Sequence, residues 1–373
     1  MKKIIFPFLS IIVLTLLFSN CKKKKTEDEL LEDNFDKSGM LSNYADNVIT
    51  PNFNIAKNAL DSFEIAYNNF IANKSTVNLN LTQQKFIRAY ITFQYISTFE
   101  FGPSETELIR SNFNTYPCDT TQINSNITSG VYDFNIISNL DAKAFPAIDY
   151  LLFGKSQTDA TLVALFDTDA NAANRTNYVT NCISEIKTKL NTVISGWSSS
   201  YKNTFVSSTG SEIGSSLGML VNQLNFEIDL LKNAKIGIPL GKKSLDVALP
   251  EKCEAYYAQN YSVNLAKHCL QNIENVYLGR SLNGSDGLGL DDYLDALKAE
   301  HNSGTLNNAI KNQFAIAKQK LALVQEPLSN SVTSDAPTVD IAYVELVKLL
   351  VLLKTDMPSV LGIIITYQDG DGD

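Results

Sequence analysis

Apolar residues recur at steps of three and four along most of this 373-residue chain, which is the spacing of one face of an α-helix. Runs that alternate apolar and polar residues, as half-buried strands do, are scarce. The pattern therefore predicts an all-α fold. The predicted helices cover residues 50–72, 81–101, 178–197, 217–231, 262–278, 306–324 and 339–354.

Short polar signals indicate where some of these helices begin and end. Thr50 followed by Pro51 predicts an N-cap and a first-turn proline for the first helix. Gly-Pro at 102–103 predicts the end of the second helix, since this pair cannot continue it. Ser104 and Glu107 then have the spacing of a capping box, which predicts a new helix start.

A polar segment at residues 156–174 separates two groups of predicted helices of comparable size. The segment is rich in small and polar residues, as linkers between packed units are. We therefore predict two helical-bundle domains, at residues 39–160 and 161–365. No sequence repeat between the two groups is visible.

The N-terminus has the pattern of an export signal. Lys2 and Lys3 precede an apolar run, Ile4 to Leu17, which is too short for a comfortable membrane span. The run ends in Leu-Phe-Ser-Asn followed by Cys21, which resembles the lipobox of bacterial lipoproteins. This predicts a signal peptide at residues 1–20 and lipidation of Cys21.

Beyond Cys21, residues 21–38 are strongly charged and predict a flexible tether, and residues 366–373 predict an acidic tail. The tail begins like a calcium loop, but the chain stops long before the glutamate that closes such a loop. The expected location is the cell envelope, lipid-anchored in the outer membrane. The side of that membrane is left open.

Charge and composition exclude some classes of partner. The formal charge is −9, and removal of residues 1–20 deletes Lys2 and Lys3 but no acid, which gives −9 − 2 = −11. No basic face is apparent, so nucleic acid is not an expected partner. Only two histidines occur, His268 and His301, and no CxxC pair, so a closed zinc site is not expected.

Four cysteines remain after Cys21, and two interpretations of them stay open. An even number in an oxidising compartment permits disulfides, with three possible connectivities. A position such as Cys182, within an apolar helical stripe, is also an ordinary place for a buried free thiol. The four are Cys118, Cys182, Cys253 and Cys269.

The segment "AFPAIDYLLFG", residues 144–154, contains one charge in an apolar run. A lone carboxylate among large apolar side chains is costly unless it has a partner, so Asp149 calls for explanation. Three positions earlier, where a helix would place a companion on the same face, stands Pro146, which can neither donate nor ligate.

An ordered set of segments resembles the imelysin family, and within it the lipoproteins of Bacteroidetes. The resemblance covers nearly the whole chain after the signal peptide, and it implies an all-helical envelope protein of two bundles with a site between them. Members are linked to peptidase activity and to iron acquisition. The segments are "NYADNVITPNF" near the start, "FEFGP" at 99–103, "TYPCDTTQINSNI" at 115–127, "AIDYLLFG" at 147–154, "SLGMLVNQL" at 216–224, "KIGIPLG" at 235–241, "NIENVYLG" at 272–279 and "ITYQDGDGD" at the C-terminus.

The signature of that family is Gly-x-His-x-x-Glu. Carried over by position, the glycine falls on Ala144, the histidine on Pro146 and the glutamate on Asp149. The acid is kept with a side chain one methylene shorter, and the imidazole is lost. The resemblance also places an acid just before "FEFGP", where this chain has Ser97. A metal ligand and a near-neutral base are therefore missing from the motif.

Five residues are candidates for contact with a ligand, each beside a simpler explanation. Asp149 would anchor a ligand or stabilise its own helix, and Asp119 has the position of an N-cap. Glu227 and Glu254 would line a site or lie on solvated helix faces, with the second interpretation favoured. Tyr257 belongs with Tyr256 and Tyr261 to a cluster that would stack on a ligand or simply pack. The candidates are Asp119, Asp149, Glu227, Glu254 and Tyr257.

No residue pattern here demands catalysis, since no Ser-His-Asp set, HExxH helix or phosphate loop occurs. We expect a non-catalytic binding component of the envelope, linked to iron or nutrient acquisition, with an unidentified ligand or envelope protein as partner. One alternative is an imelysin-type peptidase that uses the surviving carboxylates, and another is a structural envelope protein. No cofactor and no metal-binding residue is assigned, and the identity of any metal ion is left open.

Overall fold

The structure, a computed structural model, describes residues 34–367. The predicted signal peptide, Cys21, most of the tether and most of the acidic tail lie outside these residues. The described residues from Phe35 onward belong to one compact unit. The division at residue 160 stays a prediction.

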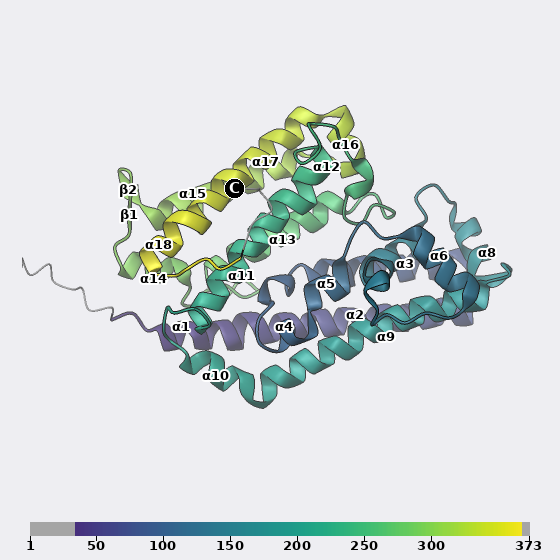
Figure 1. The fold of residues 1–373 in the computed structure, drawn as a ribbon, viewed down its shortest axis with the longest axis horizontal. Helices are drawn as coiled ribbons and strands as arrows, with labels where there is room; N and C mark the ends of the chain where they lie inside the picture. The colour runs from purple at the N-terminus through teal and green to yellow at the C-terminus, as the bar shows by residue number, and fades with distance from the viewer. Residues whose placement is uncertain (1–33, 368–373) are drawn as a thin grey trace, which may run out of the picture. The chain divides into compact units, whose positions relative to one another are not determined.

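The described chain is helical, as the periodicity predicts, and its two strands have two residues each. Figure 1 shows the helices in order along the chain. The first part consists of α1 Lys37–Asn43, α2 Thr50–Ala72, α3 Thr76–Phe93, α4 Pro103–Glu107, α5 Ile109–Asn114, α6 Thr120–Ser129, α7 Ala144–Phe153, α8 Asp159–Asp167, α9 Ala172–Gly196 and α10 Lys202–Ser207.

The second part contains the strands, which pair as an antiparallel two-stranded ladder in the register Glu300 with Thr305 and His301 with Gly304. It consists of α11 Ser216–Leu230, α12 Ile238–Leu240, α13 Ser262–Tyr277, α14 Leu290–Ala296, β1 Glu300–His301, β2 Gly304–Thr305, α15 Leu306–Leu323, α16 Leu328–Ser334, α17 Ala336–Val351 and α18 Met357–Leu361.

Shorter turns of other helical types connect these elements. Tight 3₁₀ turns lie at η2 Ser97–Phe99, η3 Ile137–Ala142 and η6 Pro250–Lys252. Wider π turns continue the α-helices at η1 Tyr44–Ile49, η4 Trp197–Tyr201, η5 Leu231–Gly237 and η7 Leu352–Asp356.

The helices form two groups, which can be followed in Figure 1. In the first, α2 lies against α3 and α9, and α7 packs on α9. In the second, α13, α15 and α17 lie side by side, with α11 against α13. The two groups meet where η2 contacts α11 and where α3 contacts α13. This junction positions the candidate site.

Helix α9 shows how the sequence pattern builds the core. Its residues at three- and four-residue spacing, from Tyr178 to Val193, are buried as predicted. Cys182 is one of them and is a free thiol, as are Cys118, Cys253 and Cys269. The disulfide that the even cysteine count permitted does not form among these four.

Three predicted caps or ends are wrong. Helix α2 begins at Thr50 with Pro51 in its first turn, as predicted, but Thr50 is not its N-cap, because helical backbone already runs from Lys37 through η1. The second ends at Phe93, eight residues early, where the chain tightens into η2. Ser104 lies inside α4 instead of capping it, and its buried hydroxyl makes no hydrogen bond in residues 34–367.

The turn between η2 and α4 depends on a glycine. Gly102 has φ +58°, and a Cβ there would lie 2.2 Å from the ring of Tyr201. Only glycine fits both the backbone angle and the space. The turn reverses the chain so that α4 and α5 follow directly beside η2.

Within residues 34–367, no helix combines the length and the hydropathy that a membrane span requires.

Candidate functional site

A cavity of about 360 Å³, cavity 1, lies at the junction of the two helix groups. Its walls come from α3, η2, α5 and the following loop on one side, and from α11 and η5 on the other. The wall combines buried charges with apolar side chains. The lining residues are Phe93, Ser97, Glu100, Arg110, Ser111, Asn114, Thr115, Tyr116, Phe226, Glu227, Leu230, Ala234 and Lys235.

An ion pair joins the two sides of cavity 1. Arg110 Nε lies 3.4 Å from Glu227 Oε2, and Glu227 Oε1 accepts hydrogen bonds from Ser97 Oγ at 2.8 Å and Cys269 Sγ at 3.3 Å. The guanidinium also lies over the ring of Phe226, 4.6 Å from its centroid. Glu227 is buried, so it needs this cation close by.

A second buried ion pair stands behind the cavity wall. Lys235 Nζ lies 2.6 Å from Glu254 Oε2, while Glu254 Oε1 accepts from Asn114 at 2.7 Å and Gln94 at 3.1 Å. Burial alone would lower the pKa of Lys235, but the attraction of Glu254 and other nearby anions outweighs it and raises that pKa. Glu254 thus connects α3, α5 and η5 to the loop that follows η6.

Glu100 is the carboxylate of cavity 1 without a cation of its own. Its Oε2 accepts the backbone N–H of Arg110 at 2.9 Å, and it forms no ion pair within residues 34–367. Burial raises the pKa of Glu100 to about 7, against the lowering effect of Arg110. At neutral pH this carboxyl is therefore only partly ionised.

The local backbone places Arg110 where it can reach three elements. Leu108, with φ +48°, ends α4 and begins α5 in the left-handed region. The reversal puts Arg110 in the first turn of α5, from which Nη2 donates to Ser97 O at 2.8 Å and Gln223 Oε1 at 2.9 Å. Arg110 therefore links η2, α5 and α11.

A second cavity of about 230 Å³, cavity 2, contains two of the motif positions, and Tyr116 lines both cavities. Asp149 accepts the backbone N–H groups of Tyr257 at 3.0 Å and Ala258 at 2.9 Å, one on each oxygen. Burial raises the pKa of Asp149 to about 7, against these two bonds. The lining residues are Tyr116, Pro117, Cys118, Pro146, Asp149, Glu251, Cys253, Ala255, Tyr256 and Tyr257.

The motif positions are used structurally. Ala144, in the glycine position, has φ +54° and is fully buried, so the backbone keeps the shape that glycine would favour. Pro146 lies in the first turn of α7, where a proline is tolerated. Asp149 holds the segment after Ala255 against α7. The loss of the imidazole has left a helix start that is well packed.

The tyrosines of the predicted cluster pack partly on one another. Tyr257 meets Tyr150 and Tyr256 edge-on, with centroids 4.9 and 5.2 Å apart. Tyr256 also bonds to Lys155, whose ammonium lies 3.7 Å from the ring centroid. Tyr257 therefore borders cavity 2 as part of an aromatic wall.

The residues at the motif do not fit a transition-metal ion. Pro146 offers no ligand atom, and both oxygens of Asp149 already accept peptide N–H groups. No three His, Cys, Asp or Glu side chains in residues 34–367 come together in a metal-binding arrangement. His268 instead bonds Tyr95 Oη through Nδ1 at 2.7 Å, and His301 lies 3.6 Å from Asp356.

The five predicted site residues fall in different places. Asp149 and Tyr257 line cavity 2, Glu227 lines cavity 1, and Glu254 stands behind it. Asp119 caps α6 by accepting from Gln122 N at 2.9 Å and lines neither cavity. The favoured interpretation of Glu227 and Glu254 as solvated is wrong, because their exposed fractions are 2% and 1%.

The sequence interpretation missed Glu100, Arg110 and Lys235. A signal for two of them was present: Glu100 is the charge in "FEFGP" and Lys235 opens "KIGIPLG", both segments that carried the family resemblance. In both segments a single charged residue stands among apolar residues, which indicates a buried charge with a partner. Arg110 had no such context, because it lies in a polar stretch that reads as surface.

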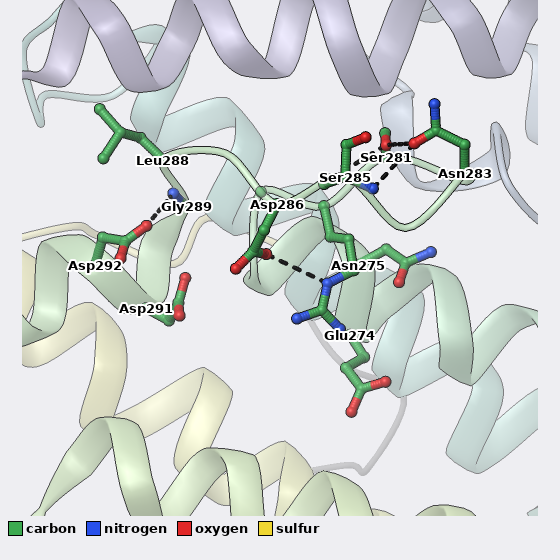
Figure 2. Close-up of polar contacts among 12 residues, drawn as sticks. Glu274, Asn275, Ser281, Asn283, Ser285, Asp286, Leu288, Gly289, Asp291 and Asp292 are labelled. Carbon is green, nitrogen blue, oxygen red and sulfur yellow. Dashed lines mark hydrogen bonds and ion pairs between the residues drawn. The ribbon is translucent and has the colours of Figure 1, made fainter.

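The acidic segment after α13 is a well-bonded loop and not a second site. Figure 2 shows Asp286 paired with a guanidinium and Asp292 turned toward Gly289. Arg280 Nε lies 3.2 Å from Asp286 Oδ1, and Gly289 N donates to Asp292 Oδ2 at 2.9 Å. Asp291 pairs with a lysine of α15 at 2.7 Å. Each carboxylate thus has its own partner.

Comparison with known proteins places this fold. A structure described as that of a candidate iron-regulated protein A precursor from Parabacteroides distasonis ATCC 8503 has a TM-score of 0.72 at 15% identity, and the match covers 87% of this chain and 95% of that one. An imelysin-like protein from Psychrobacter arcticum 273-4 gives a TM-score of 0.69 at 18% identity, covering 89% and 97%. At these identities the likeness concerns the fold.

A search of curated proteins found no match to this chain. The family model described as Imelysin (Peptidase_M75) matches residues 49–353, which is most of the sequence. This span includes both helix groups, both cavities and the altered motif. The chain belongs to the imelysin family.

Proposed function

We propose that this protein is a binding component of the bacterial cell envelope, anchored by a lipid on Cys21, with cavity 1 as its binding site. The observation that carries the proposal is the wall of cavity 1, where Glu100, Arg110, Glu227 and Lys235 converge on about 360 Å³ of space. Small-molecule binding sites are typically pockets with mostly apolar walls and a small number of precisely placed polar groups.

Binding without catalysis accounts for the altered motif. The motif has lost its imidazole, and Asp149 is committed to two backbone N–H groups. Asp149 keeps lone pairs on both oxygens, but without the imidazole the motif has no second group with which to share a proton. In cavity 1, Glu227 is held by the ion pair with Arg110 and Glu100 by the backbone N–H of Arg110, which suits recognition.

The link to iron or nutrient acquisition rests on the family and on one similar structure, which is described as a candidate iron-regulated protein A precursor. We propose that the present protein serves the same broad role of capturing a scarce solute at the envelope. Iron-limited growth of the source organism should raise its abundance, measured by quantitative mass spectrometry against iron-replete cells. Unchanged abundance would remove iron from the proposal.

The binding role is tested by closing cavity 1. Ala234→Phe places a ring into the cavity, and Ala164→Phe on the exposed face of α8 is the matched control. The full-length protein is purified in detergent without chelator, and retained small molecules are identified by native mass spectrometry. We expect a bound molecule in the wild type and the control that is absent from Ala234→Phe.

The peptidase alternative predicts a different result. Unfolded casein incubated with the full-length protein would be cleaved, with sensitivity to chelator and to Asp149→Ala. We expect no cleavage above a boiled control. Chelator-sensitive cleavage that Asp149→Ala abolishes would replace the binding role by catalysis.

The lipid anchor is tested at Cys21. Cys21→Ala should move the protein from the membrane fraction to the soluble fraction and abolish labelling by palmitate, since a lipoprotein is acylated on this cysteine. Fractionation with immunoblotting measures the shift, and Cys118→Ala is a control that leaves the anchor intact. Continued membrane association of the Cys21 variant would contradict the lipoprotein assignment.

A further inference from the structure

The carboxylates of cavity 1 have unused hydrogen-bond acceptors. Glu100 uses Oε2 for the N–H of Arg110, and its Oε1 accepts no hydrogen bond within residues 34–367. Glu227 Oε2 likewise has no hydrogen-bond donor there and only the ion-pair contact with Arg110 Nε at 3.4 Å. Both side chains are more than nine-tenths buried. Glu227 Oε2 is a fully buried acceptor without a donor, and Glu100 Oε1 is an unused acceptor beside it in the cavity wall, so both favour a ligand that donates.

The cations of the same cavity have unused donors. Arg110 spends Nη2 on Ser97 O and Gln223 Oε1, while Nη1 makes no hydrogen bond in the described part of the chain. Lys235 spends one of its three ammonium N–H groups on Glu254 Oε2. Two cationic groups with spare donors favour a ligand that carries a carboxylate.

The remaining wall is apolar and sets the size and character of what fits. A volume of about 360 Å³ lies near the lower end of the range of small-molecule pockets, roughly 300–1,000 Å³. An amino acid or a dipeptide is of this size. The apolar part consists of Phe93, Phe226, Leu230 and Ala234.

The lining carries both signs of charge, with Glu100 and Glu227 opposite Arg110 and Lys235, and Lys235 is also paired with Glu254 behind the wall. A purely anionic ligand would approach Glu100 and Glu227 closely, and a purely cationic ligand would approach Arg110 and Lys235. A ligand with both charges at its two ends satisfies all four groups and leaves no buried charge opposed.

We propose, building on the binding role above, that cavity 1 takes a zwitterion: a free amino acid or a dipeptide with an apolar side chain. Its ammonium group lies between Glu100 and Glu227, and its carboxylate binds Arg110 and Lys235. The apolar side chain packs against Phe93 and the other apolar residues of the wall.

The experiment is isothermal titration calorimetry of the full-length protein in detergent, after ligand removal by dialysis. The probes are L-phenylalanine and leucyl-phenylalanine, each compared with an analogue that lacks one charge: the N-acetyl form without the ammonium and the amide without the carboxylate. We expect one of the two zwitterions to bind, and each of its one-charge analogues to bind at least tenfold more weakly.

Glu100→Gln tests the ammonium contact, because it keeps the shape and removes the charge. In this variant the zwitterion and its N-acetyl analogue should differ less than in the wild type. Glu300→Gln, an exposed acid of β1 that lines neither cavity, is the matched control and should change nothing. A Glu100 variant that keeps the full wild-type discrimination would overturn the placement of the ammonium.

The outcomes separate this proposal from the binding role. Equal affinity for a zwitterion and either one-charge analogue would overturn the zwitterion and keep the binding role. The same holds if neither zwitterion binds while native mass spectrometry shows another molecule that Ala234→Phe excludes. If no probe binds and no molecule is retained, both proposals fail.

Discussion

Cavity 1 and cavity 2 share the wall residue Tyr116 but differ in what their acids do. In cavity 2, Asp149 has both oxygens occupied by backbone N–H groups. In cavity 1, Glu100 and Glu227 each keep one oxygen without a hydrogen-bond donor, within the described residues. The first carboxylate stabilises the fold, and the other two remain available to a ligand.

The residues at the position of a family motif need not be the residues that are free to bind a ligand. Pro146 and Asp149 occupy the motif and serve packing. The groups with spare bonding capacity lie in cavity 1, outside the Gly-x-His-x-x-Glu signature. Burial alone does not distinguish the two cavities, since burial also raises the pKa of both Asp149 and Glu100 to about 7.

Glu254→Ala should cause the largest loss in the free energy of unfolding. The variant leaves Lys235 buried without its anion and removes the acceptor of Gln94 and Asn114. Breaking a buried pair from one side costs about 3–5 kcal/mol of unfolding free energy. Chemical denaturation followed by circular dichroism measures it, with Glu251→Ala at the exposed rim of cavity 2 as control. A loss below about 1 kcal/mol would show that the pair is not holding the wall.

Asp149→Ala should cause the second-largest loss of stability. Two buried backbone N–H groups, of Tyr257 and Ala258, would lose their acceptors, at a cost of about 2–4 kcal/mol in total. Zwitterion affinity at cavity 1, measured by calorimetry, should stay within about twofold because the contact residues are untouched. Asp119→Ala, the loss of an exposed N-cap, is a milder reference at about 1 kcal/mol. A large loss of affinity with unchanged stability would reverse the roles of the two cavities.

The pH dependence should distinguish Glu100 from its neighbours. Burial raises its pKa from 4.5 to about 7, with Arg110 lowering it and Glu227 and Glu105 adding to the rise. The folded state therefore holds a proton that the unfolded state releases above pH 4.5, so unfolding free energy falls as pH rises from about 5 to 7. Each such group contributes at most about 1.4 kcal/mol per pH unit.

Glu100→Gln should flatten this slope, measured by denaturation at pH 5, 6, 7 and 8. Asp149 contributes a slope of the same sign, so part of the dependence should remain. An unchanged slope in Glu100→Gln would mean that this carboxyl is already ionised at pH 5.

The smallest effect should come from Ala144→Gly. Relief of the left-handed backbone, about 1–2 kcal/mol, offsets the lost methyl burial and the greater freedom of glycine in the unfolded chain. The net change should stay within about 0.5 kcal/mol by thermal unfolding. Ala147→Gly, equally buried in the same helix, gains no relief and should lose about 1.5 kcal/mol. Equal losses would mean that Ala144 carries no strain.

The helices were predictable because their signal is local. The stripe from Tyr178 to Val193 is buried in α9, and the starts of α13 and α15 fall at the predicted residues, Ser262 and Leu306. Helix ends failed where tertiary contacts decide. Helical backbone runs through Thr50, and Phe93 ends α3 where Gln94 turns inward to meet Glu254.

The site was harder to predict because its members are far apart in sequence. Arg110 and Glu227 form a pair across more than a hundred residues, and no local spacing indicates such a partner. Glu227 and Glu254 were interpreted as solvated because a charged residue usually faces water, although Glu227 lies between Phe226 and Ile228. Asp119 was correctly predicted as an N-cap, since capping is a contact within three residues.

The two N–H···O bonds of Asp149 have a consequence for restoring the family signature. Pro146→His alone would place an imidazole near a carboxylate that already holds the segment after Ala255, so a new pair would compete with the bonds to Tyr257 and Ala258 for the same oxygens. A longer acid at position 149 alone would disturb those bonds and gain no companion. Both changes are therefore needed together, along with a shift of the segment after Ala255.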